Sequence, residues 1–115
     1  MSFLERKTVS QLRLGRLPLR LETARYLHPI LPENERICYC NSGEVENELH
    51  FLFQCSSYVQ LRTSWLNKLM LPDNFEEISS LEKLAIVLNV PENVKETARY
   101  LLSALDLRRS LNKDY

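Results

Sequence analysis

The chain has 115 residues, 44% of them hydrophobic, which is enough to bury a modest core in one domain without cross-links. Fifteen Lys and Arg residues balance fifteen Asp and Glu residues, so no net charge draws the protein to nucleic acid or to a membrane surface. With only two glycines and many leucines, the composition favours helices over a turn-rich β architecture.

The three cysteines and the N-terminal segment bear on the compartment. Three is an odd number, and the first residues have no apolar core of the length that a secretory signal requires. No run approaches the roughly 20 apolar residues of a membrane span. We therefore expect reduced thiols in a soluble intracellular protein, nuclear or cytoplasmic, with no membrane partner.

Two helices and a linker are predicted in the first third of the chain. An apolar stripe of near-helical spacing predicts a first helix over residues 3–14 that ends at Gly15. Pro18 suits the first position of a second helix, which should end before Pro29. The prolines and polar residues of 29–36 predict an extended connection.

Three further helices are predicted after this connection. An amphipathic pattern over residues 49–70 predicts the third. Ser79 and Glu82 form a capping-box pattern at the start of the fourth, and Pro91 separates the fourth from the last. The core face of the fourth helix is expected to consist of Leu81, Leu84, Ala85 and Leu88. One side of the last helix is expected to carry Val94, Ala98, Leu101, Leu105 and Arg108.

We therefore expect an all-α fold in which residues 1–115 form a single domain. About five helices should make one small bundle, with a short zinc knuckle or hairpin at about residues 36–56, between the second and third helices.

All three cysteines and one of the two histidines lie in the pattern C-x-C-x9-H-x4-C. Cys38, Cys40, His50 and Cys55 are the donor set of a small tetrahedral zinc site. In an extended chain Cys38 and Cys40 point to one face. On an ideal α-helix His50 and Cys55 would be turned about 140° apart, so His50 is expected before the helix or in an irregular first turn.

Other interpretations of these residues remain. Cys55 can be a core cysteine, with Cys38 and Cys40 exposed thiols and His50 a residue at a helix start. His28 is a substitute ligand, although it lies where the dipole at the end of the second helix favours a cation. No H-E-x-x-H pattern is present and the four ligands leave no open position, so we expect neither an enzyme nor a small-molecule substrate.

A wider pattern surrounds these four residues. It comprises residues 12–26, which include Leu-Pro-Leu-Arg-Leu-Glu, together with 36–38, 44–48, 50–55, 58 and 61–62. This pattern resembles the zinc-binding region that follows the polymerase in non-LTR retrotransposon reverse transcriptases. Residues 74–75, 79–83, 97–100 and 108–109 are similar to the helical extension in animal copies of such elements.

The resemblance implies that Cys38, Cys40, His50 and Cys55 bind Zn²⁺. In the family, two residues normally separate the cysteine pair, whereas here Tyr39 alone does. The chain has no polymerase domain and no paired catalytic aspartates, so we expect a non-catalytic module that is part of such an enzyme's C-terminus or derived from it.

The leading functional hypothesis is binding of RNA or DNA. Its physical basis is a basic N-terminal quarter with near-helically spaced arginines, next to one arginine and one aromatic ring in the knuckle. The candidate nucleic-acid-binding residues are Arg13, Arg16, Arg20, Arg25, Arg36 and Tyr39.

Two alternatives stand beside it. The arginines can form a solvated face or pair with Glu22, Glu33 and Glu35. The chain can instead be a metal-stabilised or metal-free structural or protein-interaction module, in which Tyr58, Leu61 and Trp65 form an exposed face for a protein partner; neutral net charge favours this second alternative.

Overall fold

The computed structural model describes residues 1–19, 32–40 and 42–111. In these ranges the chain forms the α-helices α1 (Phe3–Arg13), α3 (Val59–Asn67), α4 (Ser80–Asn89) and α5 (Pro91–Leu111). Short 3₁₀ turns lie at Glu33–Glu35, Ser56–Tyr58 and Phe75–Glu77, and a π-helical turn lies at His50–Gln54. The described residues contain one isolated β-bridge, between Ile37 and Val45, and no strand. The all-α class is confirmed.

Two further expectations concern the second helix and membrane spans. The second helix expected from Pro18 falls outside the described residues, apart from a bend at Pro18 and Leu19. No helix in the described ranges is both long and apolar enough to cross a bilayer.

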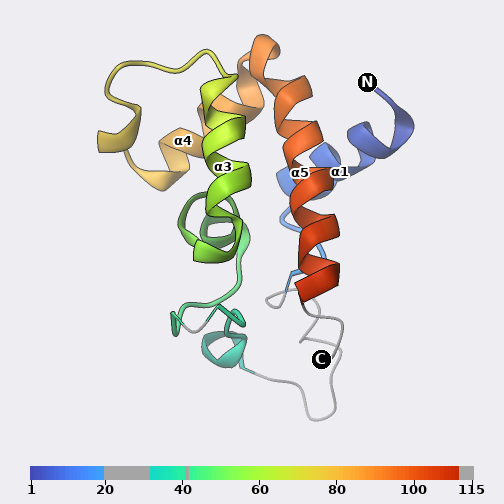
Figure 1. The fold of residues 1–115 in the computed structure, drawn as a ribbon, viewed down its shortest axis with the longest axis vertical. Coiled ribbons are helices and arrows are strands. Elements are labelled where there is room, and N and C mark those ends of the chain that lie inside the picture. The colour runs from blue at the N-terminus through green and yellow to red at the C-terminus, as the bar shows by residue number, and fades with distance from the viewer. Residues whose placement is uncertain (20–31, 41, 112–115) are drawn as a thin grey trace.

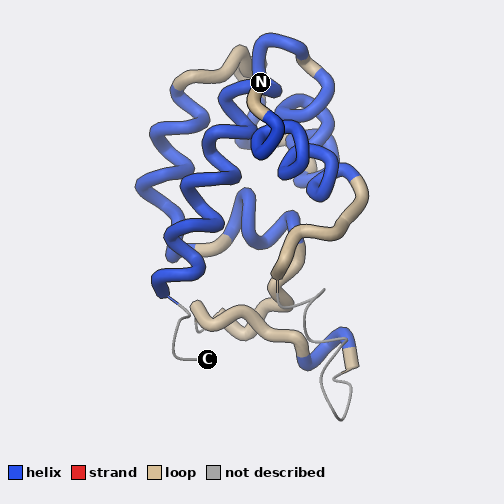
Figure 2. Tube along the Cα trace, turned by 90° about the vertical axis from the view of Figure 1, so that its right-hand side faces the viewer, coloured by secondary structure: helices blue, strands red, loops and turns tan. Residues whose placement is uncertain are grey.

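Helix α5 is the central helix of the bundle. Its 21 residues span about 31 Å at 1.5 Å per residue, and α1, α3 and α4 all pack against it (Figure 1). The side predicted to be apolar is buried at Ala98, Leu101 and Leu105. The loops that carry the knuckle lie across the end of the bundle (Figure 2).

Helix α4 is rotated relative to the prediction. Leu81 is 69% exposed and Ala85 is also exposed, whereas Val87 and Leu88 are buried. Because α4 carries apolar residues on nearly every side, its sequence did not select a face, and packing against α5 does. At its N-terminus the Ser79 hydroxyl accepts the Glu82 amide as predicted, 3.2 Å away, but that hydroxyl itself donates to the Glu82 carboxylate.

Buried polar side chains connect the helices. Asn93, which is fully buried, accepts the Met70 amide through Oδ1 at 2.8 Å and donates through Nδ2 to the Met70 and Ile86 carbonyls at 3.0 and 3.3 Å. The Trp65 ring stacks on Tyr100 with centroids 4.1 Å apart, and its Nε1 donates to Thr97. These contacts fix α5 against α4 and against the end of α3.

Asn93→Ala is expected to destabilise the fold by about 2 kcal/mol, because the Met70 amide and two carbonyls lose their partners. Urea denaturation followed by circular dichroism measures this loss. The matched control is Asn89→Ala, which removes an exposed amide at the end of α4 and should change stability by less than about 0.5 kcal/mol. Equal effects of the two substitutions would contradict the role given to Asn93.

Candidate metal centre

The first half of the site is a tight hairpin. The Cys38 amide donates to the Glu44 carbonyl at 2.9 Å, and the Glu46 amide donates to the Arg36 carbonyl at 3.0 Å. Gly43 has φ of 79°, a conformation that L side chains rarely adopt, so glycine permits the turn between the two arms. The hairpin places Cys38 on its first arm and Cys40 in a turn that begins at Tyr39, so the extended link expected between the two cysteines was wrong.

The second half is a π-helical turn where the sequence predicted one continuous helix. Asn47 Oδ1 accepts the His50 amide at 2.9 Å and starts the turn. The Cys55 amide donates to the His50 carbonyl at 2.7 Å, an i to i+5 bond. Cys55 itself is extended, with φ of −65° and ψ of 126°, so it interrupts the helix expected over residues 49–70. The wide turn brings residue 55 back over residue 50, which an α-helix would not do.

Arg62 on α3 holds this turn in place. Its Nε donates to the Leu52 carbonyl at 2.8 Å and its Nη2 donates to the Cys55 carbonyl at 2.6 Å. The last carbonyls of a helical turn lack intrahelical donors, and Arg62 supplies donors here; the Cys55 carbonyl also accepts the Tyr58 amide at 3.4 Å. The sequence analysis assigned no role to Arg62, and its spacing from Cys55 alone does not reveal one.

The four predicted ligands converge. Their ligand atoms all lie within 4.8 Å of one another. The sulfurs of Cys38 and Cys55 are 3.7 Å apart, and Cys40 Sγ is 3.4 Å from His50 Nε2. Around one tetrahedral zinc ion, two sulfurs would be about 3.8 Å apart and a sulfur and an imidazole nitrogen about 3.6 Å. The residues therefore lie close enough to bind one metal ion.

Burial supports the same assignment. Cys55 is fully buried, Cys38 is 7% exposed and His50 is 3% exposed, while Cys40 is half-buried. His50 Nδ1 is buried and has no hydrogen-bond partner among the described residues. A metal bond at Nε2 would place the proton on Nδ1 and leave this nitrogen without a partner, so the support for the site comes from the burial of the sulfurs.

The thiols differ in acidity. Burial raises the pKa of Cys38 well above its ordinary value. Burial also opposes ionisation of Cys40, but the hydrogen bonds from Ser42, His50 and Cys38 outweigh it and lower the pKa of Cys40. A divalent ion that bound here would displace the proton of Cys38, since thiolates are the ligands of metals.

A buried ion pair adjoins the site, and the sequence analysis missed it. Glu46, which is 1% exposed, accepts from Arg108 Nε at 2.8 Å and from Arg108 Nη2 at 2.6 Å. Burial lowers the pKa of Arg108, but the bonds to Glu46 and the charges of neighbouring groups raise it by a larger amount. The pKa of Arg108 therefore lies above its ordinary value. Within the acidic spacer, no local pattern distinguishes Glu46 from Glu44 or Glu48.

The predicted nucleic-acid-binding residues do not form one exposed cluster among the described residues. Arg13 Nη2 donates to the Leu88 carbonyl at 2.8 Å, Arg36 is 8% exposed and Tyr39 is half-buried. Arg16 is exposed. Arg20, Arg25, Glu22 and the substitute ligand His28 lie outside the described residues.

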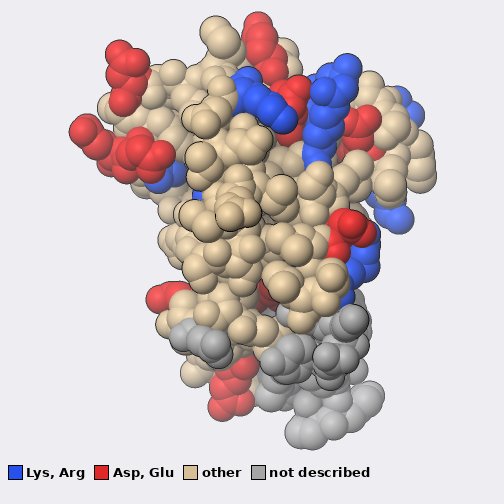
Figure 3. Space-filling view, in the orientation of Figure 1, with Lys and Arg blue, Asp and Glu red and all other residues tan. Residues whose placement is uncertain are grey.

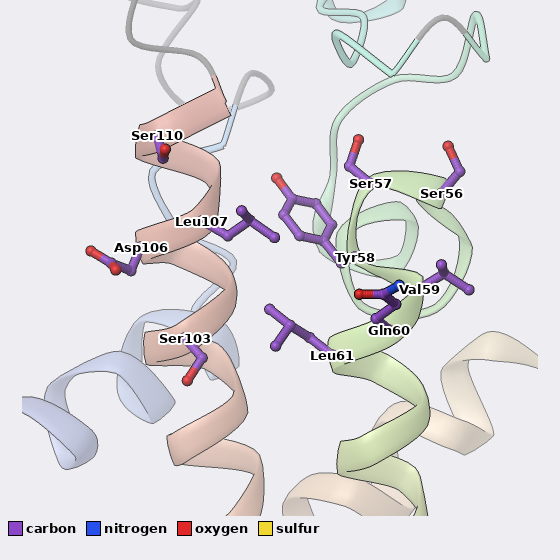
Figure 4. Close-up of a pocket in the computed structure, with 10 residues that line it drawn as sticks. All are labelled: Ser56, Ser57, Tyr58, Val59, Gln60, Leu61, Ser103, Asp106, Leu107 and Ser110. Atoms are coloured by element: carbon purple, nitrogen blue, oxygen red, sulfur yellow. The ribbon is translucent and has the colours of Figure 1, made fainter.

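The expected aromatic face for a protein partner is largely core. Trp65 and Tyr58 are each 3% exposed, and Leu61 is half-buried. A groove of about 640 Å³ nevertheless runs between the start of α3 and the end of α5, where Leu61 and Leu107 face each other (Figure 4). On this face of the molecule, charged side chains gather over the upper part and along the edges, and uncharged side chains occupy the middle (Figure 3).

The chain matches no protein-family model, no curated protein and no solved structure. The resemblance to the zinc-binding region of reverse transcriptases therefore stays a prediction, and the geometry of the four ligands carries the functional argument.

The geometry predicts one bound metal ion per chain. Cys55→Ser should reduce the metal content of purified protein to near zero, because the neutral hydroxyl replaces a fully buried sulfur in the donor set. Plasma mass spectrometry gives the stoichiometry, and cobalt substitution gives thiolate-to-metal absorption as a second readout. Ser56→Ala, an exposed neighbour outside the cluster, should leave both unchanged. Full metal content in Cys55→Ser would remove Cys55 from the site.

Proposed function

We propose that this chain is a non-catalytic module in which zinc has a structural role. The observation that carries the proposal is the approach of four Cys and His ligand atoms to within 4.8 Å of one another. A set of three thiolates and one imidazole is typical of structural zinc, and softer or harder ions are less suited to it. Because the protein fills all four positions, no site is left for an activated water molecule.

The metal would join two segments of different local structure, a hairpin and a π-helical turn. The hairpin supplies Cys38 and Cys40, and the π-helical turn supplies His50 and Cys55. The hairpin is pinned by few backbone hydrogen bonds, and an isolated hairpin is marginal in water. A bound ion would act as a local cross-link, while the helices keep a core of their own.

Chelation is expected to destabilise the protein and to loosen the knuckle first. Metal present at about 1,000 times its dissociation constant stabilises by about 4 kcal/mol, so removing it should lower Tm by about 15 °C. Differential scanning calorimetry with and without a chelator measures the shift. Hydrogen exchange should accelerate at residues 36–55 more than at the buried turns of α5. An unchanged Tm in protein that does contain metal would contradict a structural role.

We also propose that the module binds RNA or DNA. The support is the basic N-terminal segment, the exposed Arg16 and the resemblance to reverse transcriptase C-terminal regions. Arg13 and Arg36 are expected to contribute little, because one is bonded to a backbone carbonyl and the other is covered. The expected contacts are to phosphates, made by Arg16, Arg20 and Arg25.

Arg16→Ala, Arg20→Ala and Arg25→Ala in combination should weaken binding to a fluorescent single-stranded oligonucleotide. If each arginine neutralises one phosphate, the slope of log affinity against log salt should fall by about 2. Fluorescence anisotropy across a salt series gives both quantities. The matched control removes three basic side chains elsewhere, at Lys68, Lys95 and Arg109, all exposed.

The outcome also separates this hypothesis from its alternative. Equal losses in the two triple variants would show that binding is not localised to the N-terminal segment. If the wild-type protein does not bind at low salt, nucleic-acid binding is wrong, and the metal-stabilised interaction module remains, with the α3–α5 groove as its candidate surface.

A further inference from the structure

The Glu46 carboxylate lies in an unusual place for an acid in a zinc knuckle. It is 1% exposed, and in the sequence it stands between the ligands Cys40 and His50. Each of its oxygens accepts one hydrogen bond from the planar guanidinium of Arg108, at 2.8 and 2.6 Å. This fork fixes both the distance and the orientation of the two groups.

Stability alone does not account for such a pair. Removing two charges from water costs several kcal/mol per ion, which the attraction between them barely offsets. The next arginine along α5 illustrates the inexpensive alternative, because Arg109 pairs with Asp106 on the surface, with both side chains mostly exposed. What the buried pair adds is a fixed position for the knuckle relative to α5, across 62 residues of sequence.

The pair is connected to the ligands through the backbone of the hairpin. The amide of Glu46 donates to the Arg36 carbonyl, two residues before Cys38. The side chains of Cys38, Cys40 and Glu46 line one small cavity of about 170 Å³, together with Tyr58 and the end of α5 at Leu111. A displacement of Glu46 would therefore move the hairpin that carries two of the three cysteines.

Charge favours the same arrangement. Three thiolates and a neutral imidazole around a divalent ion carry one net negative charge, and the Glu46 carboxylate adds a second next to it. Arg108 is a cation bonded to that carboxylate, and its side chain is 14% exposed. The positive charge of Arg108 stabilises the negatively charged, metal-bound site in a region where water screens charges little.

We propose that Arg108, acting through Glu46, is a positioning residue for the metal centre, so that metal occupancy and docking of the last turns of α5 are coupled. The inference rests on the proposed metal-binding function. By linkage the coupling is reciprocal: an intact pair strengthens metal binding, and bound metal stabilises the end of α5 by the same free energy.

The test compares metal affinity in Arg108→Met and Arg109→Met, using cobalt absorbance and competition with a zinc chelator. Residues that orient metal ligands typically change affinity by about 10- to 100-fold when mutated, and Arg108→Met should weaken binding by that factor. Arg109→Met removes an exposed arginine one position later and should stay within about twofold. Arg108→Lys, which keeps the charge and loses the fork, should fall between them.

A second readout separates positioning from simple stabilisation. In the wild-type protein, metal should slow hydrogen exchange at residues 104–111 of α5, and in Arg108→Met this protection should disappear. A lower Tm in Arg108→Met with unchanged metal affinity and unchanged protection would overturn the inference while leaving the metal site intact. If Arg108→Met does not fold, Arg108→Lys and Glu46→Gln decide by the same criteria, with exposed Glu44→Gln as the control for the latter. Wild-type protein that binds no metal would refute the proposed function itself.

Discussion

The hydrogen bond from the Cys55 amide to the His50 carbonyl is the constraint on which the candidate metal centre depends. An α-helical register would point these two side chains in different directions, and no rotamer change would bring both to one ion. The i to i+5 turn removes this conflict at the cost of an interrupted helix. Two side chains compensate for the interruption, since Asn47 caps the start of the turn and Arg62 binds carbonyls at its end.

The packing of α5 against the other helices provides a fixed framework for the segments that carry the candidate ligands. The stacked Trp65 and Tyr100 rings and the Asn93 bonds fix α5 against α3 and α4. Arg62 and Arg108 then extend from two helices of that framework to the turn and to the hairpin. The ligand-bearing segments have little regular structure, so their geometry depends on helices that carry none of the ligands.

Sequence patterns predicted the elements better than their details. Periodicity and the proline and serine signals located α1, α4 and α5 because each follows a local rule. The predicted buried face of α4 was wrong, because that face is selected by packing against α5, which the sequence of α4 does not specify. The convergence of Cys38, Cys40, His50 and Cys55 could be predicted because thiols and imidazole are rare and closely spaced in the sequence. Glu46 and Arg62 were missed because their roles arise from partners on other elements.

The short Cys38–Cys40 link shows why spacing alone is an incomplete guide to a metal site. A two-residue separation normally lets a turn bring the sulfurs together. Here the pairing of Ile37 with Val45 fixes the first arm as far as Cys38, and a turn at Tyr39 and Cys40 places the second sulfur. Cys38 then meets Cys55, and Cys40 meets His50, as two contacts between the same pair of segments. A one-residue link is therefore compatible with convergence when a turn follows Cys38, and the backbone pairs at Arg36 and Glu44 hold the arm that leads into this turn.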